Sequence, residues 1–411
     1  MKDPFLQHTL SNGLRVVVET MPHVRSAAAG FQVLTGARDE VAEMAGVSHF
    51  LEHMMFKGTE KRGWQDITID FDRMGSTYNA YTSEDHTVYY GWVRAADIDR
   101  QLELLADMLR SVLPAEEFDT ERKVILEEIA MSKDSHEHLA YDFIQARVFA
   151  GHPLAWPVLG YEQTVADMTR DQMWAYFKRR YAPGNVMLVV AGNVGAQRIV
   201  ETAEALCGDW EPVPNGQQTV APEFRTGTDA LPTDRFNQQI VALTFPAASA
   251  TDPMTESADA AAAILGGSNS RFYWNIVQAG VSSQAGAYHV AYGDCGLMIL
   301  SGTCQPEKAE RLLDSMRTEA STICKEKVAP HEVERVKNKR RTSLAAESEV
   351  PYQRLSQIMD DMHYRGRPRT VDEVLADVDA ISPATIHDHF QRYPIDKGGH
   401  LAGIGPRDWP T

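Results

Sequence analysis

The chain has 411 residues, of which 43% are hydrophobic and 24% are charged, the composition of a soluble globular protein. This length exceeds that of one ordinary domain and predicts two domains of about 200 residues each. The net charge of −17 argues against nucleic-acid binding, because neutralising phosphates requires clustered Lys and Arg.

The beginning of the chain, MKDPFLQHTLSNGLRVVVE, has no apolar run preceded by basic residues, so no signal peptide is predicted. No apolar stretch approaches the roughly 18 residues of a membrane span. The cysteines form no C-x-x-C pair and are expected to be reduced thiols. These features predict a cytoplasmic protein without a membrane partner.

The first predicted elements are two short strands and a helix. The strands are LRVVVE, residues 14–19, and AAAGFQVL, residues 27–34. The helix is expected at residues 43–57, where it would place His49 and His53 one turn apart on one face. Two imidazoles at this spacing can hold a single zinc ion.

Glu52 stands between these histidines in the order H-x-x-E-H. A glutamate there can accept a proton from a water molecule on the metal without being a ligand. The alternative is a solvated helix face. Against it, the helix carries five apolar residues, Val47, Phe50, Leu51, Met54 and Met55. They indicate a helix buried on much of its circumference, in which His and Glu need partners.

A zinc enzyme needs a third protein ligand and an open fourth position. The favoured source is the acidic helix TERKVILEEIAMSK, residues 120–133, because Glu121 and Glu128 are two turns apart and share one face. A carboxylate held in the core is costly unless a cation takes it. Glu127 is the second choice. The histidine alternatives are His136, His138 and His152, and the first two lie in a polar stretch that is expected to be a solvated loop.

The second half of the chain repeats the order of elements of the first. A β-rich pair of segments, a polar turn and an amphipathic helix occupy residues 79–109 and again residues 286–316. A helix opened near a proline and acidic residues follows in each half, at residues 114–133 and 329–348. The chain is therefore predicted to be a duplicated α+β unit.

Residues 208–234 separate the halves and are rich in Pro, Gly and Thr, which predicts an interdomain linker. The predicted domains are then residues 1–207, with the zinc site, and residues 235–411, without one. Each is expected to be a mostly antiparallel sheet with helices packed on one face.

The sequence resembles the pitrilysin, insulysin and mitochondrial processing peptidase family, the inverzincins, which carry H-x-x-E-H. Residues 49–62, HFLEHMMFKGTEKR, are close to the family's form over the whole stretch. Glu121 and Glu128 match two family glutamates, seven residues apart, on a later helix. The resemblance covers nearly the entire chain, including the duplication.

By this resemblance the protein is a zinc metalloendopeptidase that hydrolyses peptides or unfolded segments. The implied metal ligands are His49, His53 and Glu128. The implied catalytic residues are Glu52, the general base, and Glu121, which orients a ligand without binding the metal. Four residues, Asn79, Ala80, Tyr81 and Thr82, match the family's edge strand beside the metal, where substrate is bound in extended form by strand addition.

The second half has no counterpart of this metal site. Opposite H-x-x-E-H it has SADAAAAILGG, and opposite the two glutamates it has Glu334 and Arg341. Many family members also carry, in this half, an Arg and a Tyr seven residues apart that contact substrate and the developing oxyanion. Here the segment SRFYWNIVQAGVSSQAGAY matches that pattern only in Ser270 and Arg271.

Two dimeric arrangements are therefore open, both expected to form a clamshell that encloses a chamber. In the favoured one, this chain is the zinc-bearing subunit of a heterodimer whose homologous partner supplies the Arg and the Tyr. In the other, it is a self-sufficient homodimer that has replaced those donors, for instance with Tyr288. The alternative function is a non-catalytic or weakly active scaffold subunit of the same fold.

Overall fold

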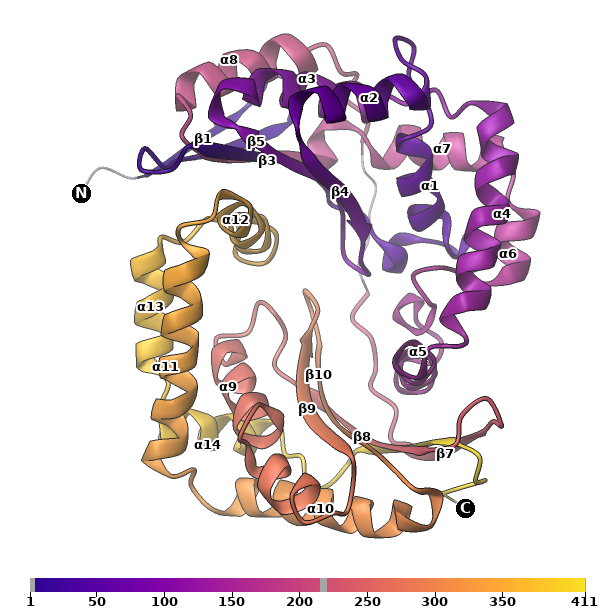
Figure 1. Ribbon diagram of the computed structural model, residues 1–411, viewed down its shortest axis with the longest axis vertical. Helices are drawn as coiled ribbons and strands as arrows, with labels where there is room; N and C mark the ends of the chain where they lie inside the picture. Colours follow the sequence, from indigo (N-terminus) through magenta and orange to yellow (C-terminus); the bar gives the residue numbers. More distant parts are fainter. Residues whose placement is uncertain (1–3, 215–219, 411) are drawn as a thin grey trace. The chain divides into compact units, whose positions relative to one another are not determined.

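The computed structural model describes residues 4–214 and 220–410, which form two compact units. Among the described residues, the first unit takes 4–131, 156–214 and 345–370, and the second takes 132–155, 220–344 and 371–410. Each unit is built on one sheet (Figure 1).

The sheet of the first unit has six strands in the order β1-β2-β6-β3-β5-β4. The strands are β1 (Phe5–Thr9), β2 (Arg15–Thr20), β3 (Ser26–Val33), β4 (Thr77–Thr82), β5 (Thr87–Arg94) and β6 (Val186–Gly192). Only β2 and β6 pair in parallel. β4 is an edge strand, since β5 is its only partner among the described strands.

Helices cover both faces of this sheet. The helices of the unit are α1 (Val47–Met55), α2 (Trp64–Met74), α3 (Ile98–Met108), α4 (Ala115–Ser132), α6 (Glu162–Asp167), α7 (Arg170–Arg180), α8 (Ala196–Cys207) and α12 (Pro351–Arg365). Successive residues of a strand point to opposite faces, so β3 sends Ala29 and Phe31 into the larger core, with α1 and α3. Ala28 points to the other face and packs with residues of α12. Figure 1 shows this helix beside the sheet.

A buried ion pair fixes α12 to the sheet. Arg354 donates two hydrogen bonds to the carboxylate of Glu19 on β2, from Nε at 2.8 Å and from Nη2 at 3.0 Å. The Arg354 side chain is 1% exposed. The α+β class and the antiparallel-rich sheets are confirmed. The prediction of helices on one face is wrong for the first sheet, because α12, from the second half of the sequence, covers its other face.

The second unit has a five-stranded sheet in the order β7-β11-β8-β10-β9. Its strands are β7 (Gly227–Pro232), β8 (Gln239–Ala247), β9 (Gln284–Ala291), β10 (Gly296–Cys304) and β11 (His400–Gly405). Its helices are α5 (His136–Val148), α9 (Thr255–Gly266), α10 (Ala309–Lys325), α11 (Pro330–Glu347), α13 (Val371–Ala380) and α14 (Pro383–Arg392). Here α5, from the first half of the sequence, contacts β8 and β11.

The internal duplication is visible element by element. Helix α1 packs beside edge strand β4, and α9 packs beside edge strand β9. Helices α4 and α11 both have 18 residues. The predicted boundaries 1–207 and 235–411 divide the sequence into its two similar halves and stay a prediction. The compact units divide the chain differently, because each includes one segment from the other half: residues 345–370 in the first unit and residues 132–155 in the second. Part of the predicted linker 208–234, residues 215–219, lies outside the described residues, and β7 occupies its end.

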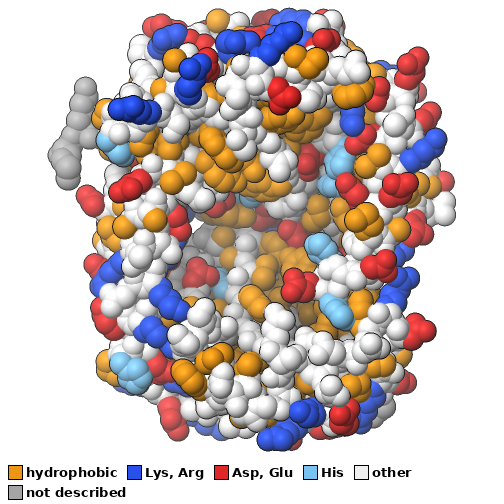
Figure 2. Space-filling model, in the orientation of Figure 1, with side chains coloured by type: hydrophobic (Ala, Val, Ile, Leu, Met, Phe, Trp, Pro, Cys, Tyr) orange, Lys and Arg blue, Asp and Glu red, His pale blue; other side chains and the backbone are white. Residues whose placement is uncertain are grey.

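On the face drawn in Figure 2, Lys and Arg side chains are interspersed with Asp and Glu. On this face the acidic side chains are therefore mixed with basic ones rather than gathered in one patch. Among the helices of residues 4–214 and 220–410, none combines the length and the apolar character needed to cross a membrane.

Candidate metal centre

Helix α1, which carries the H-x-x-E-H motif, is shorter than predicted. It begins at Val47 rather than near residue 43, because Gly46 adopts a left-handed conformation with φ of 95°. A Cβ on Gly46 would lie 2.7 Å from the carbonyl oxygen of Leu159, so this turn requires glycine. The buried carboxylate of Glu40 accepts hydrogen bonds from the N–H groups of Gly46 and Ser48, both at 2.7 Å, and so caps the helix.

The apolar side of α1 is buried as predicted. The five apolar residues Val47, Phe50, Leu51, Met54 and Met55 are all fully buried in the core of the first unit. The polar residues His49, Glu52 and His53 occupy the remaining side: the His49 side chain is 12% exposed and that of His53 is 20% exposed. The helix thus presents its motif at the edge of the core.

Helix α4 brings the third predicted residue to this place. The Oε2 atom of Glu128 lies 3.7 Å from the Nε2 atoms of both His49 and His53. One donor atom from each of these three residues lies within 4.8 Å of the others. In the described residues, this is the group of His, Cys, Asp and Glu side chains that could hold a metal ion.

The other candidates for a third ligand lie elsewhere. Glu127 is exposed and outside the group. His136 packs on the ring of Phe236, and His152 bonds through Nε2 to the carbonyl of Val220. The predicted loop around His136 and His138 is wrong, because Ser135 caps a helix here by accepting a hydrogen bond from the His138 N–H.

The three residues fit a zinc ion. Two imidazole nitrogens and one carboxylate oxygen are the donor set of many catalytic zinc sites. Burial and the neighbouring His53 lower the pKa of His49 to about 3, so its ring is neutral and can offer a lone pair. The Nδ1 atom of His49 is buried and has no hydrogen-bond partner among the described residues. Buried polar atoms normally have one, so hydrogen bonding at this atom does not account for the burial of the ring.

Glu121 orients the second histidine. Its Oε1 atom is 2.8 Å from His53 Nδ1, and its Oε2 atom is 2.6 Å from the ammonium of Lys57. Burial alone would raise the pKa of Glu121, but the bonds from His53 and Lys57 outweigh it and hold the pKa below its usual value. A charged Glu121 can only accept a hydrogen bond, so Nδ1 of His53 carries the hydrogen and donates it to Oε1. In the neutral ring this leaves the lone pair on Nε2, directed away from Glu121.

Glu52 has one short contact, with the edge strand. The hydroxyl of Thr82 donates to its Oε2 atom at 2.6 Å. Burial raises the pKa of Glu52, while the Thr82 bond acts in the opposite direction. Thr82 was predicted to contact substrate, and in the structure its hydroxyl is engaged by Glu52. Neither this contact nor that of Lys57 was foreseen from the sequence, which has no spacing signal for either.

The four residues predicted to bind substrate lie on β4. Asn79 and Tyr81 are exposed, whereas Ala80 is buried. The N–H of Ala80 donates to the side chain of Asn79 at 2.9 Å. The strand therefore has one side that no described strand pairs with, and one of its amides is satisfied by a side chain.

The sequence comparison set Glu334 and Arg341 of α11 opposite the two glutamates of α4. In the second unit these two residues form an ion pair with each other at 2.7 Å. Arg271 is held by Glu332 through two hydrogen bonds of 2.8 Å. Tyr288, on edge strand β9, is 52% exposed. Arg271, which matches the start of the family segment, is thus already engaged, whereas Tyr288, the substitute considered for the missing donors, is accessible.

Two family patterns match the chain. The one described as insulinase (peptidase family M16) matches residues 15–162, and the peptidase M16 inactive domain matches residues 167–340. The chain belongs to peptidase family M16. The inactive-domain match covers most of the second half, which agrees with the absence of the motif there.

Relatives and solved structures agree with this assignment. The chain is 30% identical to the "uncharacterized zinc protease YmxG" of Bacillus subtilis (strain 168), over 92% of each chain. The crystal structure of a protease from Helicobacter pylori has the same fold, with a TM-score of 0.92 at 21% identity over 98% of this chain and 99% of that one. A chain of complex III from Candida albicans also shares the fold, with a TM-score of 0.83 at 17% identity over 98% of this chain and 96% of that one.

Proposed function

We propose that this M16 chain is a zinc metalloendopeptidase whose single metal is held by His49, His53 and Glu128. The observation that carries the proposal is the convergence of three donor atoms from α1 and α4, with Glu52 on the same helix turn. The names of relatives support zinc-dependent proteolysis in general. The residue assignments come from the motif and the family resemblance, and the geometry of this chain supports them.

The chain's own residues divide the work. A zinc ion supplies a Lewis acid that polarises a carbonyl group and makes water a stronger nucleophile. Glu52 takes the proton of the attacking water and then gives it to the leaving amine. Burial raises the pKa of Glu52, which moves it in the direction that favours accepting and then returning a proton. Glu121 holds His53 with its Nε2 lone pair available.

Substrate is proposed to bind as an extended segment along the unpaired side of β4. Strand addition uses main-chain hydrogen bonds and so accepts many sequences. Asn79, Ala80 and Tyr81 would contact the added segment. A peptide there would lie beside Thr82, whose hydroxyl touches the proposed base.

We further propose that full activity requires a partner subunit. The second half lacks the Arg–Tyr pair of the family, and Arg271 is tied to Glu332. A preorganised oxyanion donor contributes about 2.7–4 kcal/mol to catalysis. A homologous subunit that supplies the Arg and the Tyr would restore that contribution. The alternative is a homodimer in which Tyr288 serves as the donor. We also propose a cytoplasmic location.

The second candidate function is a scaffold subunit with little catalysis. The fold shared with a chain of complex III gives this candidate its support. Against it stands the retention of His49, Glu52, His53 and Glu128, which a scaffold has no need to keep.

The distinguishing experiment compares the wild-type chain with Glu52→Gln, with and without a candidate partner. We expect the variant to retain zinc and to lose cleavage of an unfolded peptide by about 10²–10⁴-fold, the usual contribution of a general base. Glu127→Gln, on the exposed side of α4, is the matched control. Unchanged cleavage in Glu52→Gln would refute the base assignment, and no cleavage by any form of the wild type would favour the scaffold.

A further inference from the structure

We propose that Lys57 is a positioning residue of the metal site, acting on His53 through Glu121. This inference rests on the proposed function, because it concerns how firmly the chain holds zinc. Lys57 is outside the H-x-x-E-H motif and belongs to the turn that follows α1.

The two oxygens of Glu121 have separate partners. Oε1 faces His53 Nδ1 at 2.8 Å, and Oε2 faces the Lys57 ammonium at 2.6 Å. The Glu121 side chain is 5% exposed, so little water is available to replace a lost partner. Without Lys57, a buried carboxylate oxygen would lose its charged partner, and the carboxylate would be free to turn away from His53.

The charges around the site make this cation important. Three carboxylates lie near the two histidines, from Glu52, Glu121 and Glu128. In the described contacts of these carboxylates, Lys57 is the Lys or Arg that forms an ion pair. Because the Lys57 ammonium holds Oε2 of Glu121 at 2.6 Å while Oε1 faces His53 at 2.8 Å, it supports the arrangement on which the ligand depends.

The backbone of Lys57 is held at both sides. Its N–H donates to the carbonyl of Met54 at 3.2 Å. The next residue, Gly58, accepts hydrogen bonds at its carbonyl from the Ser111 hydroxyl at 2.8 Å and from the Val112 N–H at 3.1 Å. The ammonium therefore reaches Glu121 from a fixed starting point.

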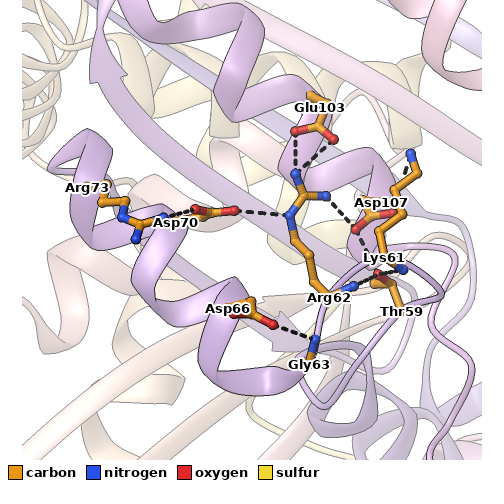
Figure 3. Close-up of polar contacts among 9 residues, drawn as sticks. All are labelled: Thr59, Lys61, Arg62, Gly63, Asp66, Asp70, Arg73, Glu103 and Asp107. Carbon is orange, nitrogen blue, oxygen red and sulfur yellow. Dashed lines mark hydrogen bonds and ion pairs between the residues drawn. The ribbon is translucent and has the colours of Figure 1, made fainter.

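The rest of the turn is fixed by Arg62, as Figure 3 shows. Its guanidinium bonds to Asp70 of α2 and to Glu103 and Asp107 of α3, at distances from 2.7 to 3.1 Å. The hydroxyl of Thr59 also donates to Asp107, at 2.8 Å. This network holds the turn without Lys57, and the Lys57 ammonium forms its ion pair with Glu121 instead.

Lys61 provides a matched control on the same turn. Its ammonium is 3.8 Å from Asp107, and its side chain is 68% exposed, against 26% for Lys57. Replacing Lys61 removes the same charge from the same turn without touching Glu121.

The test measures zinc affinity of the full-length chain by competition with a chromophoric chelator, so it does not depend on activity. We expect Lys57→Met to weaken zinc binding about tenfold, the low end of losses seen when a ligand-orienting contact is removed. Lys57→Arg, which keeps a charged donor, should recover most of the affinity, and Lys61→Met should bind as the wild type. A circular dichroism spectrum checks that each variant folds.

A double-mutant cycle separates positioning from a general structural role. In a Glu121→Gln background, Lys57→Met should cause little further loss. Wild-type affinity in Lys57→Met, an equal loss in Lys61→Met, or a second tenfold loss in the Glu121→Gln background would each overturn the inference. A wild-type chain that binds no zinc would instead refute the proposed function itself.

Discussion

His53 and Glu52 are adjacent on α1, and each is held by one side chain from another element. Glu121 of α4 holds the ring of His53, and Thr82 of β4 holds the carboxylate of Glu52. In the proposed mechanism, the first contact would serve metal binding and the second would serve proton transfer. The two tasks can therefore be perturbed separately.

Replacing Thr82 with Val should change the pH dependence of cleavage. The Thr82 hydroxyl bonds to Glu52 and lowers its pKa, so removing it raises that pKa further. Because a general base works when ionised, the acid limb of the kcat/KM profile should move to higher pH. Thr82→Ser keeps a hydroxyl and should behave as the wild type.

A role of Thr82 in substrate binding alone would give a different result. If Thr82 served only to bind substrate, Thr82→Val would raise KM and leave the position of the acid limb unchanged. The profile should be recorded with whatever partner the wild type requires.

At this scale, the sequence predicts ligands better than their supports. The helical period places His49 next to His53, and Glu121 in line with Glu128. The family resemblance, rather than the spacing, indicates that Glu128 joins the two histidines. Lys57 and Thr82 meet their partners only through tertiary packing. A lysine after a helix and a threonine on a strand have no sequence signature of such a contact.

At the scale of elements, α12 shows what the sequence could not reveal. Its apolar residues Leu355, Ile358, Met359 and Met362 indicate an amphipathic helix, but they do not say which sheet it covers. The structure places it on the first sheet, across from β2, where Arg354 meets Glu19. The predicted antiparallel-rich sheets were confirmed because strand patterning is local, whereas this exchange of helices depends on long-range packing.

Breaking the Arg354–Glu19 pair should destabilise the first unit. Glu19→Ala would leave a guanidinium buried without its charge partner, which typically costs about 3–5 kcal/mol. We expect a clear decrease in the urea midpoint of unfolding. The matched control is Asp97→Ala, which removes the partner of Arg94, whose side chain is 79% exposed, and should change stability by about 1 kcal/mol or less.

The double variant Glu19→Leu/Arg354→Met tests the reason for that loss. Removing both charges leaves no unpaired group, so most of the lost stability should return. A double variant as unstable as Glu19→Ala would show that packing, rather than the buried charge, dominates at this position.

At the scale of the whole molecule, a buried histidine of the second unit should make stability depend on pH. His389 is fully buried, and neither of its ring nitrogens has a hydrogen-bond partner among the described residues. Burial, with a contribution from His289, lowers its pKa to about 4. Between pH 6.5 and 4 the unfolded chain therefore binds more protons than the folded one, and stability falls as the pH falls.

Replacing His389 with Leu should weaken this dependence. The shift is worth up to about 3 kcal/mol across the window. Unfolding by urea at pH 7 and pH 5 should show a smaller difference in the variant than in the wild type. His23→Leu, at an exposed position, is the control, and an equal pH dependence in all three proteins would contradict the assignment.

The proposed activity of the whole molecule depends on one metal site in a duplicated chain. The first half supplies His49, His53 and Glu128, and the only group of described residues that could hold a metal ion lies there. In the second half, Glu334 and Arg341 of α11 pair with each other. A chain with a single site should therefore bind a single zinc ion, whatever its partner or substrate.

The most direct test is the zinc content of the purified full-length chain, measured by mass spectrometry after removal of loosely bound metal. We predict one zinc per chain in the wild type and in Glu52→Gln, and none in a His49→Ala/His53→Ala variant that remains folded. A wild type without zinc, or a double histidine variant that still carries one zinc per chain, would contradict the account.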